Sequence, residues 1–385
     1  MKGYKLTLLL ALVSAGLAFT QNLYSQEVSN APTAPVAYVY VQTLKGVNLY
    51  DAAANGTLTL VPGSPFATVG EMIGSNRKYF FSLGTYWVHS YPVDAKGRIG
   101  AQADQIDTQI YDSVGCGPTQ GAVLDHTGQN LYVLLNGNQF EGNYNGRAAY
   151  QTYKIAKSSG HLMFNGAANI LTELENGTQL PTITGDDKFA YAIDNVTYSS
   201  PTMAGFRHTN DGTLIDWSFS ETDPPSVANL WTMAEDPTNH LAIAFSTNGG
   251  APIASYTVDS QGNLSSTNTA EEVMMSDVWP NTMNMSPSGK FLAVASQTFS
   301  SVRTGVQIFR FNGAAPIKAF SPALTTASID QIHWDNNGHL YALSYATNQL
   351  FVFAVTETGA TQAPGSPYAV TGAYGHQGLI VVPKL

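Results

Sequence analysis

The sequence predicts an all-β protein that folds as a seven-bladed β-propeller with four antiparallel strands in each blade. Three observations predict this fold. One phrase recurs about every fifty residues along the 385-residue chain: an aliphatic segment, a polar turn, and a strand that begins with an aromatic residue or Leu. A fixed period of this length indicates an array of one supersecondary unit. Hairpins containing Gly recur at matching places, and the two chain ends are out of phase with the repeat.

The recurring phrase is the turn between the first and second strands of a blade. It is clearest in Ser286-Pro-Ser-Gly-Lys-Phe-Leu-Ala293, where 281–285 precede the turn as a first strand and 290–295 follow it as a second. A third strand over 305–311 alternates its side chains, and a looser fourth strand follows Gly313. Four antiparallel strands per repeat are typical of a propeller blade. The other copies lie at 74–81, 125–132, 185–190, 236–242 and 335–341.

A second turn recurs between the third and fourth strands. It is found at residues 91–99, 256–264 and 353–359, each time with a Gly late in the turn. Such hairpins need a residue with positive φ, which Gly supplies without steric cost.

The chain ends complete one blade between them. The N-terminal part has strands at 38–41, 46–50 and 56–60 but no first strand, whereas 377–382 is a lone first strand. We therefore expect the C-terminal strand to join the N-terminal three, which closes the ring and removes exposed edges.

Composition excludes several classes of partner and site. Charged residues are 11% of the chain, the formal net charge is −10, and Lys and Arg form no cluster, which argues against nucleic acid and anionic membranes as partners. Cys116 is the only cysteine, so no intrachain disulfide is possible, and we interpret it as a small buried residue. The histidines lack metal-ligand spacing. We expect a monomer that uses no metal and no cofactor.

The first residues have the pattern of a signal peptide. Lys2 and Lys5 precede the apolar run 6–13, and Ala18 is a small residue suited to signal peptidase. The run is too short to span a membrane. We expect a signal peptide over 1–18, an unstructured lead-in over 19–35 and the propeller over 36–385, in a protein that is periplasmic or secreted.

These strands and hairpins resemble a known family. The Tyr-x-Val-Asp-x-x-Gly-x-Leu hairpins, and the phrases Val61-Pro-Gly-Ser-Pro-Phe66 and Ala363-Pro-Gly-Ser-Pro-Tyr368, resemble seven-bladed lactonase-like (YVTN-repeat) propellers, which include 6-phosphogluconolactonase and exported surface-repeat proteins. The resemblance implies the propeller fold and a lactone hydrolase. Enzymes of that family typically carry a His-x-His-Gln phrase on an inner strand. Here the equivalent copies keep only Gln120 and the pair His376-Gln377.

A candidate site follows from the start of each innermost strand, because these starts ring one mouth of the central channel. Five of the seven equivalent positions are amides or a carboxylate, which can bind a polyhydroxylated ligand or a lactone. An alternative is that they only hold channel water. The seven positions are Val69, Gln120, Gln179, Trp231, Asn281, Asp330 and Gln377.

Candidate catalytic and anion-binding residues lie near the same mouth. His376 or His333 is the natural general base, with Asp330 able to orient an imidazole. Arg147 and Arg303 lie in loops at the same end and could meet an anionic group. Two functions stay open: a non-enzymatic exported propeller that binds a small polar molecule or a protein, and a periplasmic lactonase acting on a sugar lactone or cyclic ester.

Overall fold

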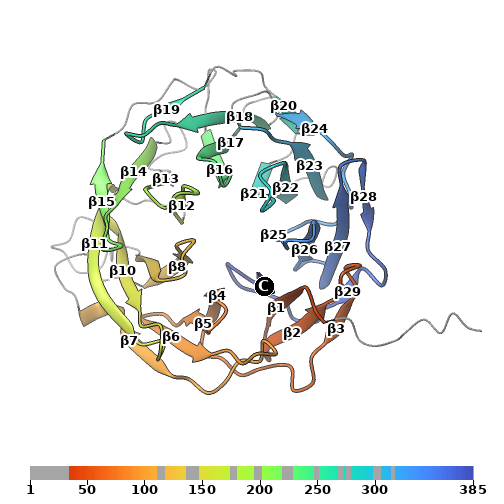
Figure 1. The fold of residues 1–385 in the computed structure, drawn as a ribbon, viewed down its shortest axis with the longest axis horizontal. Helices are drawn as coiled ribbons and strands as arrows, with labels where there is room; N and C mark the ends of the chain where they lie inside the picture. Colours follow the sequence, from red (N-terminus) through yellow and green to blue (C-terminus); the bar gives the residue numbers. More distant parts are fainter. Residues whose placement is uncertain are drawn as a thin grey trace, which may run out of the picture. The chain divides into compact units, whose positions relative to one another are not determined.

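Seven antiparallel sheets form a ring of blades around one axis in the computed structural model (Figure 1). The compact unit that they form spans residues 35–385. The predicted seven-bladed fold is therefore confirmed. The structure describes residues 34–110, 118–135, 147–173, 180–194, 202–218, 229–246, 251–266, 272–274, 279–297, 305–313 and 317–384. The predicted signal peptide, most of the lead-in and Cys116 lie outside these residues.

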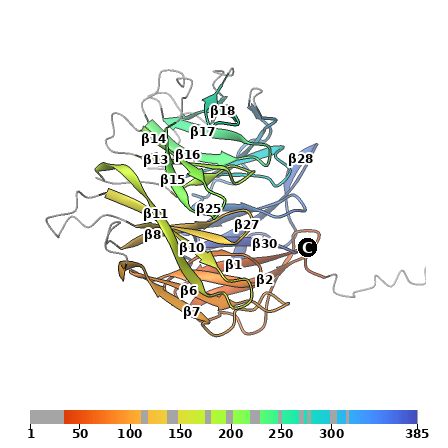
Figure 2. The ribbon, with the colours of Figure 1, turned by 60° about the vertical axis from the view of Figure 1, so that its left-hand side comes forward.

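The first four blades follow the chain from the N-terminus, except that its last strand joins blade 1 beside the first strand (Figure 2). Blade 1 contains β30 (Leu379–Pro383), β1 (Ala37–Thr43), β2 (Gly46–Ala52) and β3 (Leu58–Leu60). Blade 2 contains β4 (Glu71–Ser75), β5 (Tyr79–Leu83), β6 (Trp87–Pro92) and β7 (Asp104–Asp107). Blade 3 contains β8 (Thr119–Leu124), β9 (Asn130–Leu135), β10 (Arg147–Ile155) and β11 (Leu162–Glu173). Blade 4 contains β12 (Thr182–Ile183), β13 (Phe189–Asp194), β14 (Thr202–His208) and β15 (Leu214–Trp217).

Two of the remaining three blades carry an extra strand. Blade 5 contains β16 (Asn229–Glu235), β17 (His240–Ser246), β18 (Ala251–Val258) and β19 (Leu264–Ser265), and β20 (Glu272–Met274) also pairs with β18. Blade 6 contains β21 (Trp279–Met285), β22 (Phe291–Gln297), β23 (Gly305–Arg310) and β24 (Lys318–Ala319). Blade 7 contains β25 (Gln331–Trp334), β26 (His339–Ser344), β27 (Gln349–Thr356) and β28 (Gly359–Gln362), and β29 (Tyr368–Ala369) also pairs with β27.

The first strand of each blade lies nearest the axis (Figure 1). We call the end where these innermost strands begin the first mouth, and the end where they finish the second mouth. The only helix in the described part of the chain is the short 3-10 turn η1 (Thr108–Ile110). No helix among those residues has the length and apolar composition needed to cross a bilayer.

The two ends of the chain share blade 1, as the sequence predicted. β30 pairs antiparallel with β1, with Val381 opposite Val39 and Leu379 opposite Val41. The ladder continues past both ends of the strand, because Gln42 N–H donates to Gly378 O and Lys384 N–H donates to Val36 O. Leu379 and Val381 pack toward blade 7, whereas Ile380 and Val382 pack toward blade 2, so this strand joins two apolar clusters.

A tyrosine on the second strand of a blade ties that blade to the next one. The Tyr40, Tyr132 and Tyr191 hydroxyls donate to Gly97, Gly212 and Gly262 carbonyl oxygens, at 2.7, 3.0 and 2.7 Å. Each of these glycines lies in the third-to-fourth turn of the neighbouring blade, with φ between +75° and +88°. A side chain at Gly262 would also collide with Phe189, 2.6 Å from its Cβ position. The repeated Tyr and Gly therefore form one inter-blade contact.

The turns at the second mouth are also linked between blades. His126 Nδ1 lies 2.7 Å from Asp187 Oδ1, and the His126 N–H donates to the same oxygen at 3.1 Å. Its Nε2 lies 3.6 Å from Glu235 Oε1, so one imidazole connects blades 3, 4 and 5. The hydrogen bond with Asp187, followed by that with Glu235, raises the pKa of His126 to about 10. The sequence gave no sign of this pairing, because the three residues belong to different blades.

Deleting residues 377–385 should open the ring. The N-terminal three strands lose one ladder and the burial of Leu379, Ile380 and Val381, at about 1.5–3 kcal/mol for each side chain. We expect a large fall in the melting temperature, or oligomers formed through the free edge of β1. Deletion of residue 385 alone is the matched control. A 377–385 deletion that is monomeric with an unchanged melting temperature would contradict closure by β30.

His126 should make stability depend on pH in the alkaline range. Its folded-state pKa is raised above the ordinary 6.5, so its contribution is complete below pH 6.5 and is lost as the pH rises through about 10. His126 is 45% exposed, so we expect only about 1 kcal/mol after solvent screening. Urea unfolding at pH 6, 8 and 10 should show a wild-type advantage over His126→Gln that shrinks with pH. Gln129→Ala, an exposed position in the same turn without a titratable side chain, is the control and should show no such trend.

Candidate functional site

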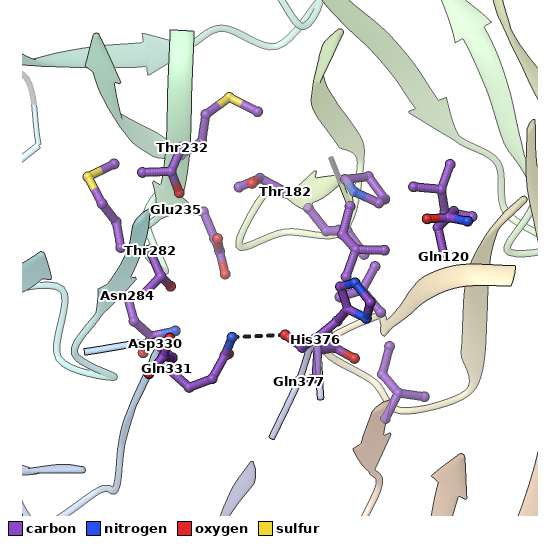
Figure 3. A pocket seen from close by; sticks show the side chains of 18 of the residues that line it. Gln120, Thr182, Thr232, Glu235, Thr282, Asn284, Asp330, Gln331, His376 and Gln377 are labelled. Atoms are coloured by element: carbon purple, nitrogen blue, oxygen red, sulfur yellow. Dashed lines mark hydrogen bonds between the residues drawn. The ribbon is translucent and has the colours of Figure 1, made fainter. Parts of the chain in front are cut away.

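An axial cavity of about 700 Å³ lies between the innermost strands. Five blades contribute side chains through β8, β12, β16, β21 and β25, and the segment before β30 completes the lining (Figure 3). Polar groups gather at the first mouth: Gln120, Asp330, Gln331, His376 and Gln377. Deeper along the axis lie Thr232 and Thr282 with Met233 and Met283, and Asn284, Glu235 and His126 follow toward the second mouth.

Three of the innermost strands have a bulge at a predicted ring position. The pairing of β8 with β9 skips Gln120, that of β16 with β17 skips Trp231, and that of β21 with β22 skips Asn281. A bulged residue leaves the ladder and its side chain is re-aimed, which is why bulges are common next to binding sites. Each bulge lies five residues before the turn that follows its strand. The same backbone feature therefore occurs at three of the predicted ring positions.

The structure places three of the predicted ring residues around one cavity. Gln120, Asp330 and Gln377 come from blades 3, 7 and 1 and line it together. Val69 lies in the loop before β4, is 53% exposed and is not among the lining residues. The structure describes the backbone but not the side chains of Trp231, Asn281 and Arg147. Gln179 and Arg303 lie outside the described residues.

His376 is held by the Glu71 carboxylate of blade 2. His376 N–H donates to Glu71 Oε2 at 3.0 Å, and Nδ1 lies 3.0 Å from the same oxygen. The His376 carbonyl also accepts a 2.8 Å hydrogen bond from Gln331 Nε2, drawn as the dashed line in Figure 3. Glu71 therefore fixes the imidazole of His376, a role that the sequence assigned to Asp330. Among the described residues, no hydrogen-bond partner faces the other ring nitrogen, Nε2, so it is available for proton transfer.

Asp330 holds the backbone around the first mouth and is 8% exposed. Its Oδ2 accepts a 2.7 Å hydrogen bond from Tyr345 N–H. The Tyr345 hydroxyl in turn donates to Gly375 O at 2.5 Å and accepts from Gly378 N–H at 3.2 Å. Burial, followed by the Asp330 charge, raises the pKa of the Tyr345 phenol, so it stays protonated and donates. Tyr345 thereby fixes the segment that carries His376 and Gln377.

His333 does not share the cavity with His376. It is half-buried in β25 and is not among the residues that line the axial cavity. Burial lowers the pKa of His333 to about 4, so its imidazole is neutral at pH 7 and a weak base. The geometry therefore favours His376 over His333 as a proton acceptor.

The sequence analysis did not select four residues that line the cavity: Thr232, Thr282, Glu235 and His126. Thr232 and Thr282 occupy equivalent positions directly after the bulges of β16 and β21, and their spacing of fifty residues could have indicated them. Glu235 and His126 could not be paired from sequence, because they belong to different blades. Among the described residues, no three or more His, Cys, Asp or Glu side chains are arranged to hold a metal ion.

No protein-family model matches the sequence, and no curated protein matches it. Solved structures match it at low identity. The periplasmic gluconolactonase of Pseudomonas aeruginosa is 13% identical with a TM-score of 0.64, and the match covers 90% of this chain and 99% of that one. A protein from Lactobacillus plantarum is 14% identical with a TM-score of 0.65, over 90% and 98% of the two chains. A protein from Bacteroides fragilis proposed to be a 6-phosphogluconolactonase is 13% identical with a TM-score of 0.60, over 90% and 98%. The predicted resemblance to lactonase-like propellers is confirmed at the level of the fold.

Proposed function

We propose that the chain is an exported binding protein that holds a small polar molecule at the first mouth of its channel. The observation that carries this proposal is the approach of Gln120, Asp330 and Gln377 from three blades to one cavity of about 700 Å³. Small-molecule sites are concavities of about 300–1,000 Å³ with a few converging polar groups. Amides both donate and accept hydrogen bonds and a carboxylate accepts them, which suits a polyhydroxylated ligand.

The charges around the cavity favour a neutral or cationic ligand. Asp330 and Glu235 line it with carboxylates, the protonated His126 offsets only the charge of Glu235, and Glu71 stands beside the first mouth. Negative groups that face a ligand repel a phosphate or carboxylate and attract a cation. We therefore place neutral polyols and amino-substituted polyols ahead of phosphorylated sugars. A protein that bound at this mouth would have to present neutral or cationic polar side chains to it.

Export is the second part of this proposal. It is supported by the basic, apolar and small-residue pattern of residues 1–18, which is typical of a signal peptide. We place the protein in the periplasm or outside the cell.

Hydrolysis of a sugar lactone or cyclic ester is a second candidate, favoured by the Glu71–His376 pair. With its Nδ1 held by Glu71, the His376 Nε2 can accept a proton from a water molecule as that water attacks the ester carbonyl. The water oxygen forms the new C–O bond, and the ring oxygen of the lactone leaves and takes up a proton. The product is the open hydroxy acid, and no other reactant is needed.

Asp330→Asn should weaken the binding of a polyol or cationic ligand by about 1–3 kcal/mol. Asn keeps an oxygen that can accept the Tyr345 N–H but removes the charge. Affinity is measured by calorimetry after a thermal-shift screen of neutral sugars, aminosugars and polyols. Asp259→Asn, the same change in an exposed hairpin turn, is the control and should leave affinity unchanged. Equal affinities in both variants would count against a ligand at the first mouth.

If the chain hydrolyses lactones, His376→Gln and Glu71→Gln should each lower kcat. The loss of a general base typically lowers a rate by about 10²–10⁴-fold. The assay follows acid release from a panel of aldono- and alkyl-lactones, with His333→Gln as the control that leaves turnover intact. Wild-type protein that turns over none of the panel would leave only the binding function, and full activity in His376→Gln would remove His376 from the reaction.

A further inference from the structure

A second, smaller cavity opens beside the axial one at the first mouth. Its volume is about 330 Å³, and it lies between the innermost strands of blades 2 and 3, β4 and β8. We call it the side pocket. Its apolar wall consists of Met72, Ile73 and Leu83, and Gly84 and Thr85 form part of its edge. The side pocket therefore offers apolar surface next to a polar channel mouth.

Both cavities share three lining residues. Gln120, His376 and Gln377 belong to the lining of the side pocket and of the axial cavity. A molecule that occupies both spaces must pass these three side chains. The junction is thus also the place where the Glu71–His376 pair and two of the ring amides meet.

Gln377 independently indicates that a hydrogen-bond donor is missing at this junction. Its Oε1 is buried, and within the described part of the chain it accepts no hydrogen bond. A buried acceptor without a donor costs about 1–3 kcal/mol, so such atoms generally have a partner in the working state of a protein. A hydroxyl or amine group of a bound molecule would provide that donor.

We propose that the side pocket receives a short apolar substituent of the same molecule whose polar part lies at the first mouth. The ligand is then a polyol or sugar that carries an alkyl, acyl or aryl group, with a hydroxyl or amine that donates to Gln377. This inference rests on the proposed binding function and narrows its ligand class. Two exposed apolar side chains, Val69 and Trp87, lie within three residues of Gly70 and Gly84 in the pocket edge.

Three probes separate the polar and apolar parts of this ligand. Methyl β-D-glucoside carries the polar part, hexyl β-D-glucoside carries both parts, and 1-hexanol carries the apolar part. Binding is measured by saturation-transfer NMR titration below the micelle concentration. Each buried methylene contributes about 0.8 kcal/mol, so hexyl glucoside should bind at least about tenfold tighter than methyl glucoside even if only part of the chain is buried.

A bulky residue at the pocket edge tests whether the tighter binding of hexyl glucoside arises in the side pocket. Thr85 is exposed in the loop between β5 and β6, so Thr85→Trp should fill the side pocket without disturbing the core. It should remove the tenfold gain of hexyl glucoside and leave methyl glucoside binding unchanged. Thr347→Trp is the matched control, because Thr347 is exposed in the equivalent loop of blade 7 and lines neither cavity. The Thr347→Trp variant should still bind hexyl glucoside about tenfold tighter than methyl glucoside.

The outcomes distinguish this inference from the proposed function. Equal binding of the two glucosides, or a gain that survives Thr85→Trp, overturns the side-pocket inference and leaves the polar site standing. Binding of 1-hexanol that Thr85→Trp abolishes, with neither glucoside bound, supports an apolar pocket but counts against the polar site for sugars. Absence of binding by all three probes overturns the inference.

Discussion

The pairing of β30 with β1 is the contact on which the rest of the structure depends. The last strand along the chain completes the first blade, so the ring of seven blades has no free end. That strand also contacts both neighbours, since Leu379 and Val381 face one apolar cluster while Ile380 and Val382 face another. The stability of the ring thus requires residues that are more than three hundred positions apart in the sequence.

The first and second mouths of the ring differ in how fully their polar groups are paired. At the second mouth, short turns are bound to their neighbours, as when Asn76 Nδ2 donates to Gly128 O or Asp186 N–H donates to Asn239 Oδ1. The Tyr–Gly contacts add to these links. At the first mouth, Gln377 has a buried oxygen that accepts no hydrogen bond from any residue that the structure describes. We infer that the second mouth mainly holds the blades together, which leaves the first mouth free for a ligand.

Closure and site are linked through one short segment. Gly375, His376 and Gln377 lie one residue before β30, and Tyr345 and Glu71 hold this segment from blades 7 and 2. The residues that close the ring therefore also place the imidazole and the amide at the junction of the two cavities. A change that loosens β30 would disturb the site as well as the fold. The melting temperature of each site variant therefore needs to be measured beside its binding or activity.

The sequence by itself determined the blade count, the four-strand unit and the shared blade 1. These features depend on local patterns, such as the turn at 286–289 and the Gly hairpins, which report strand direction without knowledge of neighbours. It also selected Gln120, Asp330 and Gln377, because the repeat places equivalent residues at equivalent heights on the axis. Only the tertiary structure decided that Glu71 rather than Asp330 holds His376, that His333 lies apart from the cavity, and that His126 joins Asp187 and Glu235. Each of these results depends either on a contact between different blades or on the direction in which one side chain points from its strand. The repeat period in the sequence determines neither.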